Sequence, residues 1–359
     1  RPKTRGPLLP ALPRRMLPAP EHKGALRRTK TMHTRIEEFA AHCARYRTPS
    51  HFRAGRQIVT TAVPFIALSA AMYFSLHVGY WLTLLLAIPL AGCALRFFVI
   101  QHDCGHGSFF ASKRANDITG RIVSLLTITP YAYWRRLHAL HHTSSANLDR
   151  RGFGDITTLT TDEYRALTPL RRLAYRIYRH PAFLLVIGGP VHFLLLQRLP
   201  LTLRRPAWEM WSSVMAHNLG IAVFYGTLLF LLGWLNFVVM VIPVLVAAAA
   251  MGVWLFYVQH QFENTSWDTR ETWDRKRGAL TGSSYYVLPS VLGWFTGNIG
   301  LHHIHHLCSH IPNYRLQECL DAMPELKTIN RLTIVESLKT ASLALWDPRS
   351  RKLVSFQGI

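Results

Sequence analysis

The chain has 359 residues, a formal net charge of +22 and 49% hydrophobic residues. A soluble globular protein is rarely so basic and so apolar at once, so this composition argues against an ordinary soluble domain. The charge does not indicate nucleic-acid binding, because no recognised binding motif accompanies it, but it suits contact with anionic membrane headgroups. The five cysteines form no close pairs, which argues against a disulfide framework and against a Cys-x-x-Cys metal site.

The first 56 residues form a basic segment that contains 14 of the 41 lysines and arginines. Its first half is rich in proline and arginine, a composition that predicts disorder. The segment lacks the central apolar run of a cleavable signal peptide. We therefore expect residues 1–56 to be a disordered N-terminal extension.

Two long apolar blocks follow in the chain. Residues 57–100 contain one charged side chain, Arg96, and residues 214–258 contain none. Each block is about twice the roughly 20 residues that a helix needs to cross a bilayer. We predict a hairpin of two transmembrane helices in each, with spans at 57–77, 82–100, 214–232 and 237–258. The alternative, buried helices of a soluble protein, is hard to reconcile with uncharged blocks of this length.

The basic residues predict how these spans are oriented. Lysines and arginines number 14 before residue 57, 15 between 101 and 213, and 11 after 258. The short turns inside the hairpins carry none. Basic residues concentrate on the cytoplasmic side of membranes, so both termini and the central region are expected there.

The central region contains two further apolar stretches, 118–133 and 181–196. Both are too short, or too interrupted by proline and glycine, to be full spans. We expect interfacial or re-entrant segments at these positions.

Three histidine clusters lie outside the predicted spans. The motif His-Asp-Cys-Gly-His occupies residues 102–106, His-Ala-Leu-His-His residues 138–142, and His-His-Ile-His-His residues 302–306. On a helix, residues three and four apart share a face, so each cluster can direct two or three imidazoles at one point. Neutral imidazole is a common ligand of transition metals. These histidines exceed the three or four protein ligands of a zinc site and predict two metal ions.

A ninth candidate ligand is His260, in the sequence Val-Gln-His-Gln-Phe at the end of the fourth predicted span. A helix ending here would deliver His260 beside the third cluster. The same polar group at a helix exit is also compatible with an interfacial anchor.

The cluster series H-x-x-x-H, H-x-x-H-H, H-x-x-H-H, arranged around two hairpins, resembles the membrane fatty acid desaturase superfamily over roughly residues 57–320. The first cluster is similar to that of acyl-lipid omega-6 (delta-12-type) desaturases. The stretches 130–138, 148–155 and 294–302 are similar to bacterial members.

This resemblance implies an all-α integral membrane protein with two transmembrane helical hairpins and a cytoplasmic helical cap that carries a histidine-ligated di-iron centre. It divides the chain into the N-terminal segment, a desaturase domain at 57–320 and a cytoplasmic tail at 321–359, and it favours the bacterial inner membrane. The metal ligands it implies are His102, His106, His138, His141, His142, His260, His302, His305 and His306.

Other positions near the clusters are weaker candidates. His303 falls at a variable position of the third motif, and His310 lies outside it. In the acyl-CoA branch of the family an asparagine one turn before the extra histidine reaches the metal through water. Phe256 stands at that position here, which leaves Asn298 as a substitute.

The acidic residues near the clusters have two readings. Candidates to hold imidazole N–H groups are Asp103, Asp149 and Asp155. Carboxylates in such loops could equally pair with nearby arginines such as Arg150 and Arg151.

The implied reaction introduces a cis double bond into a lipid acyl chain, using O2 and two electrons. No acid or base side chain breaks an unactivated C–H bond, so a redox metal is needed, and an all-nitrogen ligand set suits iron. The chain lacks a cysteine cluster for its own iron–sulfur centre. An external donor, such as an acidic ferredoxin docking on the basic face, is therefore expected.

Two alternatives remain from the sequence. A related di-iron lipid hydroxylase or carotenoid ketolase uses similar histidine clusters. A membrane metal transporter would also bind metal through histidines, but transport calls for polar residues within the spans, which contain almost none.

Overall fold

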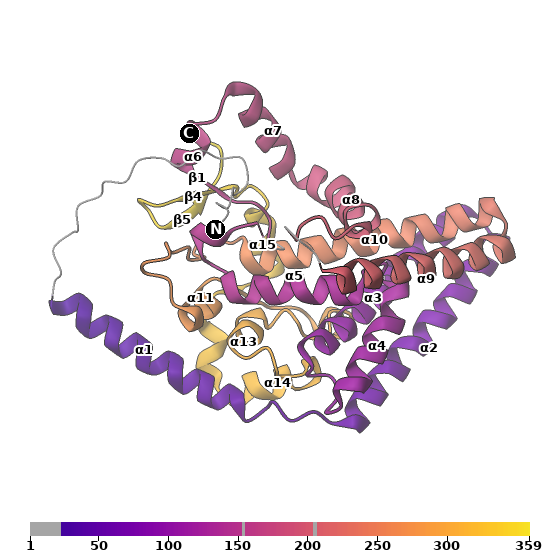
Figure 1. Cartoon of the computed structure of the whole chain (residues 1–359), viewed down its shortest axis with the longest axis horizontal. Coiled ribbons are helices and arrows are strands. Elements are labelled where there is room, and N and C mark those ends of the chain that lie inside the picture. Colours follow the sequence, from indigo (N-terminus) through magenta and orange to yellow (C-terminus); the bar gives the residue numbers. More distant parts are fainter. Residues whose placement is uncertain (1–22, 153–154, 204–206) are drawn as a thin grey trace.

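The computed structural model describes residues 23–152, 155–203 and 207–359, and the remaining residues of the predicted disordered segment, 1–22, lie outside this part. Within it the chain is mostly helical, as predicted. Figure 1 shows long helices on one side and a cap of shorter elements on the other. The long helices are α2 (His51–Ser75), α3 (Tyr80–His106), α9 (Trp208–Leu232) and α10 (Trp234–His260).

These four helices confirm the predicted spans. Each has 25 or 27 residues and is apolar enough to cross a membrane. At 1.5 Å per residue they are about 40 Å long. Their cap-side ends extend beyond the predicted bounds, so that His106 and His260 are the last residues of α3 and α10. Gly233, with φ of 74°, makes the tight turn between α9 and α10.

Arg96 is the one charged residue within the predicted spans, and its partners explain how it is tolerated. Its Nε donates to the Thr61 hydroxyl of α2 at 3.0 Å, and Nη1 donates to the Trp294 carbonyl. The guanidinium also lies 4.4 Å from the centroid of the Trp294 ring. Arg96 therefore ties two spans to α12 (Ser290–Phe295), the helix that precedes the third histidine cluster.

The prediction of disorder in the N-terminal segment is wrong for residues 23–44, which form α1 (Lys23–Ala44). The apolar side chains Ile36, Phe39 and Cys43 recur at helical spacing and are buried in the main core. The imidazole of His42 lies 2.9 Å from the Cys319 carbonyl oxygen. Burial of this stripe outweighs the basic composition that predicted disorder.

The cap is built from short elements that surround the inner ends of the long helices. Its helices are α4 (Lys113–Leu126), α5 (Tyr131–Ser144), α6 (Thr161–Arg165), α11 (Arg275–Thr281), α13 (His302–Leu307), α14 (Asn313–Asp321) and α15 (Ile334–Thr340), with single turns η1 (Leu148–Arg150) and η4 (Pro324–Thr328).

Short strands, which the all-α prediction did not include, complete the cap. They are β1 (Leu159–Thr160), β2 (Tyr285–Tyr286), β3 (Arg331–Leu332), β4 (Leu345–Asp347) and β5 (Lys352–Val354). Strand β4 pairs parallel to β1 and antiparallel to β5, and β2 pairs parallel to β3. The segment after residue 320 is thus packed onto the cap, with Trp346 and Leu353 buried. The domain boundary at 320 itself stays a prediction.

The region between α5 and α9 contains a bent helical segment in place of a straight span. It consists of α7 (Pro169–Arg179), then η2 (Phe183–Gly188), α8 (Gly189–Leu194) and η3 (Leu196–Arg198), with a bend of 74° after α7. A β-carbon at Gly189 would lie 3.2 Å from the Ala249 carbonyl oxygen, so α8 packs closely on α10. This arrangement supports the expectation of a re-entrant segment.

Candidate metal centre

Four helix ends bring the three histidine clusters and His260 together. The last turn of α3 carries His102 and His106, α5 carries the second cluster, α10 ends at His260, and α13 carries the third cluster. Figure 1 shows α5 and α13 at the inner ends of α3 and α10, on the cap side of the long helices. The site therefore lies where the membrane helices meet the cap.

The nine histidines fall into two groups, within each of which the ligand atoms lie within 4.8 Å of one another. We call them the five-histidine group and the four-histidine group. The former contains His102, His106, His138, His142 and His305. The latter contains His141, His260, His302 and His306.

Helical geometry explains this division. Residues four apart lie on one helix face, whereas adjacent residues point about 100° apart. Each i, i+4 pair therefore stays in one group, as His138 and His142 do, while the remaining histidine of the cluster, His141, joins the other group. The third cluster divides in the same way, because His305 leaves the pair formed by His302 and His306.

Within each group the Nε2 atoms face one another at short range. In the five-histidine group, Nε2 of His138 lies 3.0 Å from that of His106 and 3.1 Å from that of His142. In the four-histidine group, Nε2 of His260 lies 3.2 Å from that of His141 and 3.0 Å from that of His302. Nitrogens bound to one metal at about 2.1 Å, with perpendicular bonds, are about 3 Å apart. The spacing thus fits one metal ion per group.

Three of the histidines have their second ring nitrogen held by an oxygen. Nδ1 of His102 lies 3.0 Å from Asp103, Nδ1 of His141 contacts Asp155, and Nδ1 of His260 lies 3.0 Å from the Gly282 carbonyl. An oxygen at Nδ1 keeps the proton there and leaves the Nε2 lone pair for a metal.

Of the three predicted acidic residues, two contact the histidines. Besides His102, Asp103 also accepts the Asn313 backbone N–H at 2.6 Å, which fixes it to α14. The exposed carboxylate of Asp149 instead accepts the Arg270 backbone N–H at 2.7 Å. Asp149 therefore joins two loops, and the structure gives it no histidine partner among the described residues.

Burial favours the neutral form of five histidines of the two groups. The pKa values of His138, His142, His302, His305 and His306 lie well below the usual range, first because burial disfavours the charged ring and second because neighbouring histidines repel a further charge. Neutral rings are the form that binds metal. Among the described residues, buried Nε2 atoms of His102 and His306 have no hydrogen-bond partner, which fits a metal as theirs.

The weaker histidine candidates, His303 and His310, lie outside the two groups. The His303 Nε2 atom donates to the Leu326 carbonyl at 3.0 Å, and His310 is exposed; neither belongs to the two groups. Asn298 adopts the left-handed conformation, with φ of 58°, in the turn before α13. The Phe256 ring lies 5.1 Å from the His260 ring and 5.3 Å from the His141 ring, so an apolar face covers the four-histidine group at this position.

Several contacts at the site were not predicted from sequence. The buried Trp134 ring stacks on His138, with centroids 4.5 Å apart, and a β-carbon at Gly105 would come within 2.9 Å of that ring. The Gly282 carbonyl contacts His260, and the Asn313 backbone and side-chain amides donate to Asp103. Both residues are distant in sequence from their partners. No sequence pattern indicates such partners. Trp134, in contrast, could have been found, because it lies four residues before His138, on the same helix face.

The fold and the site together define a helical membrane protein with two buried histidine groups at the membrane–cap junction, each of which could hold a metal ion. A family model described as fatty acid desaturase matches residues 75–333. A Bacillus subtilis fatty acid desaturase is 40% identical over 84% of this chain and 86% of the relative. The chain therefore belongs to the fatty acid desaturase family, and it is an integral membrane, O2-dependent oxidoreductase that desaturates fatty acyl chains.

More distant relatives have more specific descriptions. An sn-1 acyl-lipid omega-3 desaturase (ferredoxin) of Synechocystis is 29% identical over 63% of this chain and 63% of the relative. An sn-1 oleoyl-lipid 12-desaturase of Anabaena variabilis is 26% identical over 75% and 77%. These two differ in the bond they form, so family membership alone does not assign its position.

Proposed function

We propose that the protein is an acyl-lipid desaturase whose two histidine groups each hold one iron ion. The observation that carries this proposal is the pair of groups, in which five and four imidazoles place their ligand atoms within 4.8 Å of one another. An all-nitrogen set suits a redox-active transition metal, whereas magnesium and calcium prefer oxygen ligands. When bound, the iron ions supply the O2-dependent oxidation that removes two hydrogens from an unactivated alkyl chain.

The protein's own residues orient this site and keep it dry. Asp103 and Asp155 fix the rings of His102 and His141. Phe256 covers two rings of the four-histidine group. Such a low-polarity wall favours an acyl chain over water beside the metals and limits side reactions.

We infer that the bond formed is a cis double bond of the omega-6 (delta-12) type. The support is the first cluster, His-Asp-Cys-Gly-His at 102–106, which is similar to that of omega-6 desaturases. The oleoyl-lipid 12-desaturase of Anabaena variabilis, although distant, is among the relatives. The substrate is a membrane lipid acyl chain that reaches the site from the bilayer.

The electron donor in this proposal is a ferredoxin. A relative from Synechocystis carries ferredoxin in its description. The formal net charge of +22 favours an acidic partner. In this account the protein lies in a bacterial inner membrane with its termini and site cytoplasmic, as the distribution of basic residues favours.

The test is product analysis after expression in a host that makes no polyunsaturated lipids. Mass spectrometry of the extracted lipids should show a new double bond at the twelfth carbon of oleoyl chains, absent with a His305→Ala control. A bond at another position would overturn the regiochemical proposal and leave desaturation intact. A hydroxyl or keto product would favour the hydroxylase or ketolase alternative.

A further inference from the structure

The helix α7 presents an apolar stripe to its surroundings. The side chains of Leu170, Leu173, Ala174 and Ile177 recur at helical spacing, and all four are exposed, Leu170 by 77% and Leu173 by 55%. Most helices of a cap bury their apolar stripe in the core. Here the stripe faces away from the core, and the segment that follows α7 also exposes Val186, Ile187, Leu195 and Leu196. A surface of this extent needs an apolar environment.

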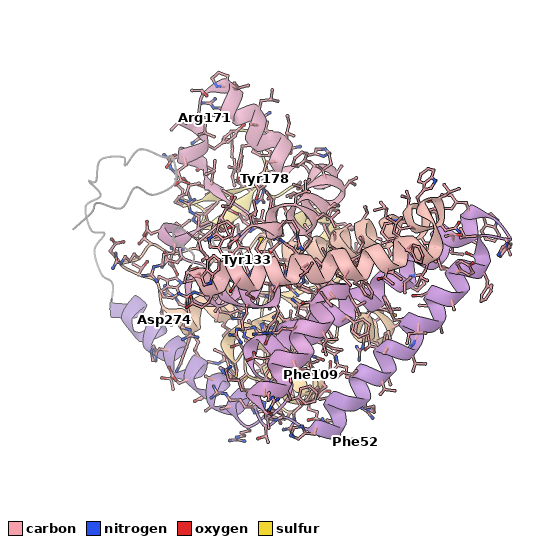
Figure 2. The ribbon with its side chains drawn as sticks, turned by 45° about the vertical axis from the view of Figure 1, so that its right-hand side comes forward. Phe52, Phe109, Tyr133, Arg171, Tyr178 and Asp274 are labelled. Carbon is pink, nitrogen blue, oxygen red and sulfur yellow. The ribbon has the colours of Figure 1, made fainter. Side chains whose placement is uncertain are left out.

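Arginines border the stripe on both sides. Helical spacing places Arg171 on one side and Arg176 on the other, and both are exposed. Figure 2 shows Arg171 near the end of α7 that is remote from the long helices. Arg176 is oriented by its Nε, which donates to the Tyr164 hydroxyl at 2.6 Å. An apolar face bordered by arginines is the pattern of a helix lying in the headgroup layer.

The position of α7 relative to the spans also indicates that it lies in the headgroup layer. The segment that follows α7 bends by 74° and packs on α10 through Gly189, next to Ala249 and Val253. Ala249 lies about 16 Å along α10 from His260, at about 1.5 Å per residue. The chain thus passes directly from α7 into the depth of the four spans, so α7 lies at their boundary with the cap (Figure 1).

The opposite face of α7 is fixed to the cap. The hydroxyls of Tyr175 and Tyr178 accept the backbone N–H groups of Leu159 and Thr157, each at 3.0 Å. The buried Arg179 donates to Gln261 at 2.8 Å. These bonds hold α7 against the strand segment that follows Asp155, the carboxylate that contacts His141. The apolar stripe therefore cannot turn inward without breaking them.

We propose that α7 docks in an anionic phospholipid headgroup layer, with Leu170, Leu173 and Ile177 toward the acyl chains and Arg171 and Arg176 at the phosphates. Because its inner face is bonded to the segment after Asp155, this contact also fixes that segment relative to the bilayer. The inference depends on the membrane spans and not on the reaction catalysed.

The depth of position 173 in a bilayer tests this docking. The five native cysteines are all buried, so a thiol-specific nitroxide on Leu173→Cys reports that position. The full-length protein is placed in vesicles of phosphatidylcholine with phosphatidylglycerol, and collision rates with O2 and with a water-soluble nickel chelate are measured. The matched control is Glu325→Cys, an exposed position of the cap.

The label at 173 should collide often with O2 and rarely with nickel, and the label at 325 should show the reverse. Frequent nickel collisions at 173 would mean a solvent-exposed stripe and would overturn the proposal. Rare collisions with both reagents would also overturn it, since they would mean that protein, such as a second copy of the chain, covers the stripe. Ile177→Cys provides a second position with the same expectations.

A second comparison tests the anionic character of the layer. The label at 173 should collide less often with the nickel chelate when phosphatidylglycerol is added to pure phosphatidylcholine. With Arg171→Gln added, the same protection should require about five times more phosphatidylglycerol. This is the effect expected from the loss of one basic residue near an anionic surface. Arg349→Gln, in the turn between β4 and β5, should leave it unchanged. Equal protection in both lipids would contradict the role assigned to the arginines.

Discussion

The two histidine groups both consist of imidazoles but are supported differently. The five-histidine group takes four of its members from α3 and α5, which pack on each other, and Asp103 anchors it to α14. The four-histidine group takes one member from α5, one from the end of α10 and two from α13. Its second nitrogens are held by Asp155 in a loop and by the Gly282 carbonyl. The first group thus rests on helix packing, and the second depends more on loops.

The two groups should respond differently to loss of a supporting residue. Contacts between packed helices persist when one hydrogen bond is lost, whereas a loop carboxylate has few other contacts that keep it in place. The four-histidine group should therefore be the more sensitive to loss of its supporting residues. Both groups should be equally sensitive to loss of a ligand, because α5 and α13 each contribute to both.

The largest effect is expected from removal of a ligand. His305→Ala removes a ring from the five-histidine group and should abolish iron binding and desaturation while the protein still inserts in the membrane. Iron content of the purified protein and lipid product analysis measure both. The control is His310→Ala, which alters an exposed histidine outside both groups and should be tolerated. Two iron equivalents in His305→Ala would show that the ligand assignment is wrong.

A smaller effect is expected when the loop carboxylate is neutralised. Asp155→Asn should weaken metal binding by about 10–100-fold, because His141 loses the acceptor that fixes its tautomer. Competition with a chelator, followed by iron analysis, measures the change. Asp149→Asn serves as the matched control, since Asp149 contacts Arg270 and not a histidine. Equal chelator sensitivity in the two variants would contradict the support assigned to Asp155.

The corresponding change in the other group should act more on folding than on metal binding. Asp103→Asn weakens the bonds to the Asn313 backbone N–H and side chain, at 2.6 and 2.9 Å. Loss of such charge-assisted bonds should lower the free energy of unfolding by about 1–3 kcal/mol. Thermal unfolding of the purified protein measures this, with Asp155→Asn for comparison. A lower melting temperature for Asp155→Asn than for Asp103→Asn would reverse the comparison between the groups.

The smallest effect on the metals is expected at His303, between the ligands of the third cluster. His303→Leu leaves the Leu326 carbonyl without its donor and should cost about 1–3 kcal/mol of stability. Iron content per folded protein should stay at the wild-type value. Loss of one iron equivalent from His303→Leu would place this residue among the ligands.

The sequence predicts much of this site because its signals are local. Helical spacing brings His138 and His142 to one side of α5, and an uncharged block longer than a bilayer must form spans. The same spacing predicts that His141 lies on a different face of α5 from His138 and His142. It does not predict which histidines of the other helices lie opposite each face. That depends on how α3, α5, α10 and α13 approach one another.

The parts that sequence did not predict depend on distant contacts. The helix α1 looked disordered from its charge, but its stripe at Ile36, Phe39 and Cys43 is stabilised by a core formed largely after residue 250. Strand β1 pairs with β4, almost 200 residues later in the chain, with Leu159 opposite Leu345. Gly282 supports His260 through a carbonyl oxygen, a group that every residue has.

The central claim is that each histidine group binds one iron ion. Anomalous diffraction at the iron absorption edge, from crystals of the full-length protein, tests it most directly. The account predicts two peaks, one among His102, His106, His138, His142 and His305, and one among His141, His260, His302 and His306. A single peak, or a peak outside these groups, would contradict it.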